Sequence, residues 1–117
     1  MAQIVDVAGV GEIPEGEAVV VDGSANETGR DIAVFHAETG EFFALDDECT
    51  HETASLADGW IEGDRVECPL HATEFCLRTG KVLCLPATES ARTHKVEVVD
   101  GRVLLHPGES VEGADRP

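Results

Sequence analysis

The sequence predicts an all-β domain, built as an antiparallel sandwich or barrel. Short runs rich in Val, Ile, Phe and Leu are separated by Gly, Pro, Asn and Asp along most of the chain. No stretch shows a sustained helical period. The 117 residues suit one domain with a core of its own and leave little room for a second.

The strands predicted from these runs, in order, are 3–7, 17–22, 31–36, 41–45, 65–67, 74–77, 81–84, 93–99 and 102–106. Several hairpin turns are expected between them, at 38–40, 78–81 and 100–101, because each contains the Gly that such turns favour. Segment 10–16 contains Pro14 and Gly16 and is expected to be a loop or a single helical turn. We expect one domain over 1–107, followed by a flexible acidic tail over 108–117.

Charge narrows the possible partners. The chain has 8 basic and 24 acidic residues, a formal net charge of −16, so nucleic acid and anionic lipid surfaces would repel it. Ten of the acids fall within 41–74, together with one base, Arg65. No apolar run approaches the roughly 18 residues of a membrane span, and the N-terminus has no signal-peptide pattern. We therefore expect a cytoplasmic protein without nucleic-acid or membrane partners.

Two short motifs carry the chemistry. Cys49-Thr50-His51 is a C-x-H box, Cys68-Pro69-Leu70-His71 is a C-x-x-H box, and sixteen residues separate them. Each box offers one thiolate and one imidazole, close enough in sequence to share one loop tip. Two sulfur and two nitrogen ligands suit either tetrahedral zinc or a Rieske cluster, in which two His replace two Cys on one iron. Zinc sites more often pair Cys with Cys and His with His, and a nucleic-acid-binding zinc module would need a basic face.

The two boxes and the segment Phe75-Cys76-Leu77-Arg78-Thr79-Gly80 resemble the Rieske ferredoxins of bacterial aromatic-ring-hydroxylating dioxygenases, of the biphenyl, naphthalene and carbazole type. The resemblance covers nearly the whole chain and includes Ile13-Pro14-Glu15-Gly16, Leu56-Ala57-Asp58-Gly59 and Leu85-Pro86-Ala87. It implies the Rieske fold, an antiparallel β-sandwich or barrel base that carries a smaller cluster-binding subdomain of loops, here about 46–73 and 85–92.

The resemblance also implies the ligands and the function. Cys49 and Cys68 would bind the inner iron of one [2Fe–2S] cluster per chain, and His51 and His71 the outer iron. The protein would be a soluble, monomeric one-electron carrier and not an enzyme. It would pass electrons from an NAD(P)H-dependent flavoprotein reductase to a terminal Rieske non-heme iron oxygenase. Two alternatives stay open: a Rieske-like small subunit of another oxidoreductase such as nitrite reductase, and a structural zinc-binding interaction module.

Further expectations concern the surroundings of the cluster. Acids near the first box are expected to steer basic partner surfaces; these are Asp46, Asp47, Glu48 and Glu52. Apolar residues are expected to form a collar that contacts the partner; these are Leu70, Leu85 and Pro86. Trp60 is expected to pack in the core near the cluster loop, and Cys76 and Cys84 to be free core thiols. The chain has no Tyr to donate a hydrogen bond to cluster sulfur. A reduction potential near the low end of the Rieske range, about −150 mV, is therefore expected.

Overall fold

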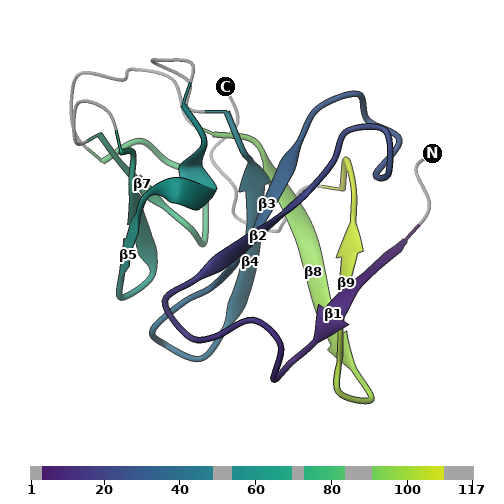
Figure 1. Cartoon of the computed structure of the whole chain (residues 1–117). Coiled ribbons are helices and arrows are strands. Elements are labelled where there is room, and N and C mark those ends of the chain that lie inside the picture. Colours follow the sequence, from purple (N-terminus) through teal and green to yellow (C-terminus); the bar gives the residue numbers. More distant parts are fainter. Residues whose placement is uncertain (1–3, 49–53, 70–72, 84–90, 110–117) are drawn as a thin grey trace.

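The computed structural model describes residues 4–48, 54–69, 73–83 and 91–109 (Figure 1). In these ranges the chain forms strands and one short 3-10 helix, in the order β1 (Val5–Gly9), β2 (Ala18–Val21), β3 (Ile32–His36), β4 (Phe42–Asp46), η1 (Leu56–Asp58), β5 (Trp60–Glu62), β6 (Arg65–Glu67), β7 (Glu74–Cys76), β8 (Thr93–Val99) and β9 (Arg102–His106). The predicted all-β class is confirmed. Within the same ranges, no helix has the length and apolar character needed to cross a bilayer.

The larger sheet has six strands in the order β1-β9-β8-β4-β3-β2, and all of its pairs are antiparallel. The hairpin between β8 and β9 turns at Asp100 and Gly101, whose φ angles are +50° and +74°. Two positive φ angles match the right-handed twist of the strands, which is why an Asp-Gly pair occurs at this turn. The turn predicted at 100–101 is therefore confirmed.

Strand β3 divides the interior into two cores. Ile32 to Phe35 are all fully buried, and successive side chains point to opposite faces of the strand. Ile32 and Val34 pack with residues of β1, β4 and β9 in one cluster. Ala33 and Phe35 pack in a second cluster with Leu56 and residues of the smaller sheet. A continuous apolar run is thus buried on both faces.

The smaller sheet has three strands in the order β5-β6-β7 and lies beside the larger sheet (Figure 1). Hydrogen bonds between turns hold the two sheets together. Glu38 receives a hydrogen bond from the Gly63 backbone N–H at 2.7 Å on Oε1, and its own N–H donates to the Gly63 carbonyl at 3.1 Å. Arg78 follows β7 and donates to Glu41, which precedes β4, and to Asp64 of the β5–β6 turn. The subdomain expected to consist of loops therefore contains a small sheet that is fixed to the base.

The strand predictions for 65–67, 93–99 and 102–106 match the structure, and most others differ by one or two residues at an end. Strand β5 was missed because its three residues fell within the loop region expected at about 46–73. Of the predicted strand 81–84, residues 81–83 make a single bridge, between Val82 and Phe75, and residue 84 lies outside the described ranges. Segment 10–16 is a turn and a loop, as expected.

Candidate metal centre

One of the four predicted ligands, Cys68, lies in the described part of the chain. Cys49, His51 and His71 lie outside the described residues, as do Glu52, Leu70, Leu85, Pro86 and Cys84. The structure therefore shows how the two ligand boxes are anchored rather than how their tips are arranged. Each anchor is built from residues on both sides of its box.

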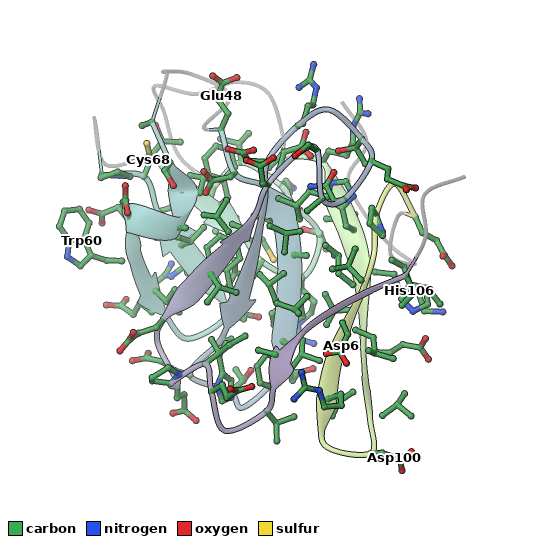
Figure 2. All side chains as sticks on the ribbon, turned by 45° about the vertical axis from the view of Figure 1, so that its right-hand side comes forward. Asp6, Glu48, Trp60, Cys68, Asp100 and His106 are labelled. Atoms are coloured by element: carbon green, nitrogen blue, oxygen red, sulfur yellow. The ribbon has the colours of Figure 1, made fainter. Side chains whose placement is uncertain are left out.

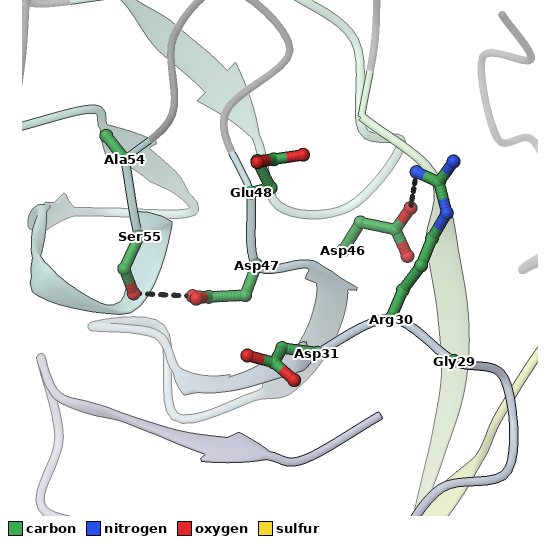
Figure 3. Close-up of a pocket in the computed structure, with 8 residues that line it drawn as sticks. All are labelled: Gly29, Arg30, Asp31, Asp46, Asp47, Glu48, Ala54 and Ser55. Atoms are coloured by element: carbon green, nitrogen blue, oxygen red, sulfur yellow. Dashed lines mark hydrogen bonds and ion pairs between the residues drawn. The ribbon is translucent and has the colours of Figure 1, made fainter. Parts of the chain in front are cut away.

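The first anchor closes the stretch that contains Cys49 and His51. Glu48 and Ser55 form an antiparallel bridge across it. The carboxylate of Asp47 accepts hydrogen bonds on Oδ1 from Ser55 Oγ at 2.8 Å and from the Ala57 backbone N–H at 3.0 Å (Figure 3). The Asp47 carbonyl also accepts a bond from the Leu56 N–H at 2.7 Å. Three residues beyond the box are thereby held against the end of β4.

The second anchor is the hairpin end of β6 and β7. The Cys68 backbone N–H donates to the Thr73 carbonyl at 2.7 Å, which continues the pairing of Glu67 with Glu74 beyond the strands. Cys68 and Thr73 are both fully buried. Cys68 is also free of any disulfide. This closed base is the described part of the second box.

Both anchors rest on the same core. Cys68, Leu56 and Phe75 belong to one buried cluster, and Ala54 packs against it. Gly59 lies so close to β6 that a Cβ atom there would overlap the Glu67 carbonyl oxygen. Figure 2 shows Glu48 and Cys68 at the same end of the molecule, opposite the hairpin at Asp100. The fold thus brings the bases of two loops, sixteen residues apart in sequence, to one place.

Acidic residues surround the first anchor. Asp31, Asp46, Asp47 and Glu48 line a cavity of about 410 Å³, together with Arg30, Ser55 and Ala54 (Figure 3). Arg30 reaches across it, with NH1 3.8 Å from Asp46 Oδ2. One cation faces four carboxylates among these residues, so the field at this end of the molecule is negative.

The expected docking role of these acids needs correction for two of them. The Asp47 side chain is buried and accepts hydrogen bonds from Ser55 and Ala57. Asp46 has a side-chain exposure of 13% and accepts a 2.7 Å hydrogen bond on Oδ1 from His94 Nε2. His94 Nδ1 in turn accepts a bond from the Gly108 N–H, so Nε2 carries the ring proton. Asp46 and Asp47 therefore have structural roles. Of the four acids expected to steer partners, Glu48 is exposed and Glu52 lies outside the described residues.

Two expectations about core residues are wrong. Trp60 is 62% exposed, because β5 is an edge strand and turns this side chain outward. Cys76 is free but only partly buried, because its neighbours Phe75 and Leu77 occupy the core side. His36 and His94 have structural partners as well; His36 Nδ1 lies 2.7 Å from the Ile13 carbonyl oxygen, and its ring stacks on Phe42.

The structural roles of Asp47 and Gly59 were not predicted from the sequence. Asp47 binds Ser55 across eight residues, and no local motif signals such a bond. Gly59 belongs to the segment Leu56-Ala57-Asp58-Gly59, but its close approach to β6 depends on a strand pairing that the sequence did not reveal.

The residues that are described fit an iron–sulfur centre. A buried thiol without a disulfide partner, at the end of a closed hairpin, can serve as a thiolate ligand that is protected from water. Elsewhere in the described ranges, no group of three or more His, Cys, Asp or Glu side chains is placed to hold a metal ion. The predicted donor set would be completed by Cys49, His51 and His71, which lie outside the described residues.

Comparison with known proteins gives a consistent result. The family model described as "Rieske [2Fe-2S] domain" matches residues 3–100. The 3-phenylpropionate/cinnamic acid dioxygenase ferredoxin subunit of Photorhabdus laumondii is 50% identical over 100 residues, which cover 85% of this chain and 90% of the relative.

Solved structures agree. One chain in the complex of reduced oxygenase and oxidized ferredoxin in carbazole 1,9a-dioxygenase is 30% identical, with a TM-score of 0.82, and the match covers 92% of this chain and 95% of that one. A putative NADH-dependent nitrite reductase small subunit from Mycobacterium tuberculosis has a TM-score of 0.78 at 19% identity, over 90% of this chain and 95% of the other. At that identity the likeness shows a shared fold alone.

Proposed function

Because the chain belongs to the Rieske [2Fe–2S] family, we propose that Cys49, His51, Cys68 and His71 bind its cluster. The observation that carries this assignment is the pair of anchors on one core. Asp47 and Ser55 close the base of the first box, and Cys68 itself closes the base of the second. Two Cys and two His on two neighbouring loops are the ligand set that a Rieske centre requires.

The chain is a ferredoxin: it carries a Rieske-type [2Fe–2S] cluster and is an electron-transfer component rather than an enzyme. When bound, such a cluster takes up and releases one electron at a time. The protein's own residues fix the ligands and exclude water. Buried Cys68, Thr73 and Phe75 keep the inner side of the site dry, and the negative field of Asp31 and Glu48 disfavours adding an electron. This supports the low potential expected from the sequence.

We propose that the electron acceptor is the terminal oxygenase of an aromatic-ring dioxygenase. The likeness to a chain solved in complex with an oxygenase supports this, and so does the dioxygenase relative at 50% identity. The donor would be an NAD(P)H-dependent flavoprotein reductase, since the chain has no nucleotide-binding motif of its own. A monomeric, cytoplasmic protein with a domain over 1–107 suits a shuttle that meets two partners in turn.

The nitrite reductase alternative has weaker support, because that likeness lies in the fold and not in sequence. A mixture of purified reductase, ferredoxin and oxygenase separates the two possibilities. We expect NADH-dependent hydroxylation of an aromatic substrate that requires the ferredoxin. If the chain stimulated nitrite reduction and left the hydroxylation unchanged, the assignment to a dioxygenase would be wrong.

A matched pair of substitutions tests the ligand assignment. Cys68→Ser should abolish the bound iron and sulfide and the electron paramagnetic resonance signal of the reduced protein, because a serine oxygen is a poor substitute for the thiolate. Cys76→Ser is the control: Cys76 lies opposite Arg65 at the far end of β7 from Thr73, is free and is partly exposed, so the signal should remain. His71→Asn and His36→Asn make the corresponding pair for histidine.

The contrary results are equally clear. A protein that is colourless and holds one zinc would support the zinc module. A Cys68→Ser variant with a full complement of iron and sulfide would remove Cys68 from the ligand set.

A further inference from the structure

The outer face of the small sheet carries an ordered row of side chains next to the cluster site. Trp60 pairs with Glu67, and Glu67 pairs with Glu74. The bridge between Phe75 and Val82, with the hydrogen bond from the Leu83 N–H to the Glu74 carbonyl, places Leu83 opposite Glu74. Paired residues of antiparallel strands project from the same face. Trp60, Glu67, Glu74 and Leu83 therefore form one row, here called the outer row.

The opposite face of the same strands points into the core. Val66 and Phe75 are fully buried, and Ile61 and Val82 pack against their cluster. Because side chains alternate along a strand, the outer row must face away from that core. Neighbouring strands lie about 4.8 Å apart, so a row across four chain segments is about 14 Å long. That length suits a small contact patch on a transient partner.

The ends of the outer row are apolar and its centre is acidic. Trp60 is 62% exposed and Leu83 is 45% exposed. Glu74 lies 3.3 Å from Arg65 Nε, and the same guanidinium reaches Glu62 through NH2 at 3.1 Å. Arg65 is thus shared between two carboxylates. Glu67, beside Trp60, makes no ion pair within the described part of the chain.

The position of the row links it to electron transfer. Glu67 immediately precedes Cys68, and Trp60 is its partner across β5 and β6. In Figure 2 the indole of Trp60 projects from the flank of the molecule beside the end that carries Cys68. A protein that contacts Trp60 would therefore approach close to the proposed cluster ligands.

We propose that the outer row is a docking surface for the terminal oxygenase, with Trp60 as its anchor; this rests on the function proposed above. A partner arginine or lysine can stack on the exposed indole and at the same time pair with the Glu67 carboxylate. A chain with a net charge of −16 needs a basic counter-surface for any specific contact. Tryptophan is among the residue types enriched where a few side chains dominate the binding energy of an interface.

Steady-state and stopped-flow kinetics with purified oxygenase test the docking surface. Trp60→Ala should raise the KM for ferredoxin about tenfold, the effect of losing an aromatic anchor. Its reduction potential and paramagnetic resonance signal should stay as in the wild type. Glu67→Gln should lower the transfer rate at low salt and weaken its salt dependence. Val98→Ala is the matched control, because Val98 is 51% exposed on the larger sheet, away from the row, and the KM should not change.

A second measurement uses the unaltered sequence. Trp60 is the sole tryptophan, so 5-fluorotryptophan gives one fluorine resonance. Adding oxygenase should shift or broaden it. An unchanged resonance together with an unchanged KM for Trp60→Ala would overturn the inference, and so would an effect confined to the reductase. These outcomes leave the cluster signal intact, whereas failure of the proposed function would appear as a wild-type protein that lacks the signal.

Discussion

Asp47 shows how one side chain can organise a ligand loop without being a ligand. It is buried, and its Oδ1 accepts hydrogen bonds from the Ser55 hydroxyl and from the Ala57 N–H. A charge in such a place is tolerated because hydrogen bonds replace its water. Its neighbour Glu48 is exposed, so two adjacent acids have opposite roles. Acidic composition alone does not separate them.

Replacing Asp47 should loosen the first ligand loop. Asp47→Ala leaves the Ala57 N–H and the Ser55 hydroxyl without their acceptor, at a cost of about 1–3 kcal/mol. The melting temperature and the iron content of the variant should both fall. Asp47→Asn keeps an acceptor oxygen and should recover part of the loss. Asp58→Ala, at an exposed acid, is the control; equal melting of the Asp47→Ala and Asp58→Ala variants would contradict this role.

Gly59 is required for a different reason, the close approach of two backbones. A Cβ atom there would overlap the Glu67 carbonyl oxygen and would stand 3.1 Å from the Leu56 carbonyl oxygen. Backbone atoms cannot move aside as a flexible side chain can, so Gly59→Ala should destabilise the protein by at least about 2 kcal/mol.

Gly11 provides the comparison, because no heavy atom lies within 4 Å of the position that a methyl group would take there, and its φ is not positive. Gly11→Ala should cost nothing, or stabilise by about 0.4–1 kcal/mol by restricting the unfolded chain. Urea unfolding of both variants measures the difference. If the two midpoints coincided, the contact between the η1–β5 junction and β6 would have no energetic role.

At the scale of elements, the sequence predicted the long strands better than the short ones. The alternating segments 93–99 and 102–106 were predicted at their observed ends, because a strand half buried in a sheet shows period two. Strand β5 has three residues, with a tryptophan that faces solvent, and so shows no such pattern. Its existence depends on pairing with β6. For the same reason, the outward position of Trp60 could not be read from composition.

The two proposed ligand boxes were identified for the opposite reason: their signal lies in residue type and spacing and needs no tertiary structure. The anchors that hold them are tertiary. Asp47 with Ser55, and Cys68 with Thr73, join positions whose relation appears only when strands β4, β6 and β7 are in place. Sequence therefore predicted the chemistry of the site, and the structure supplied its support.

The junction between the two sheets gives a prediction about pH. Arg78 donates to Glu41, with NH1 3.0 Å from Oε2, and to Asp64 at 3.3 Å, and its guanidinium lies 5.1 Å from the centre of the Phe43 ring. The hydrogen bond from Arg78 holds the pKa of Glu41 below its usual value of 4.5. A lowered pKa means that the folded state favours the ionised carboxylate. This stabilisation is complete above pH 4.5 and is lost as the pH falls through the lowered pKa.

Arg78→Gln should therefore lower the melting temperature at neutral pH, and the difference from the wild type should shrink below pH 4.5. Arg78→Lys keeps the charge but not the forked geometry and should be intermediate. Arg30→Gln, which removes a more distant contact to Asp46, serves as the comparison. A melting difference that stayed constant from neutral to acidic pH would show that Arg78 acts through packing on Phe43 instead.

At the scale of the whole molecule, different regions serve stability and partner binding. The hairpin at Asp100 lies at the opposite end of the molecule from Glu48 and Cys68 (Figure 2), and its turn and the ion pairs of Arg78 serve stability. The end that carries Glu48 and Cys68 combines a negative field with buried sulfur (Figure 2). The outer row adds exposed apolar surface beside it. A carrier with this arrangement can attract a basic partner over a distance and then contact it through a small patch.

The net charge of −16 predicts that electron transfer to the oxygenase depends strongly on salt. Raising the ionic strength from about 10 mM to about 100 mM shortens the Debye length from about 30 Å to about 10 Å, which screens charges before the proteins touch. The second-order rate of electron transfer to the oxygenase should therefore fall at least about tenfold, within the range of electrostatic steering. Oxidation of the same reduced ferredoxin by a small uncharged oxidant should change little, because no charged surface guides that encounter. If salt changed the rate to the oxygenase as little as the rate to the uncharged oxidant, electrostatic steering would be excluded. The acids would then serve the solubility of the protein, and the outer row would contact the oxygenase without long-range attraction.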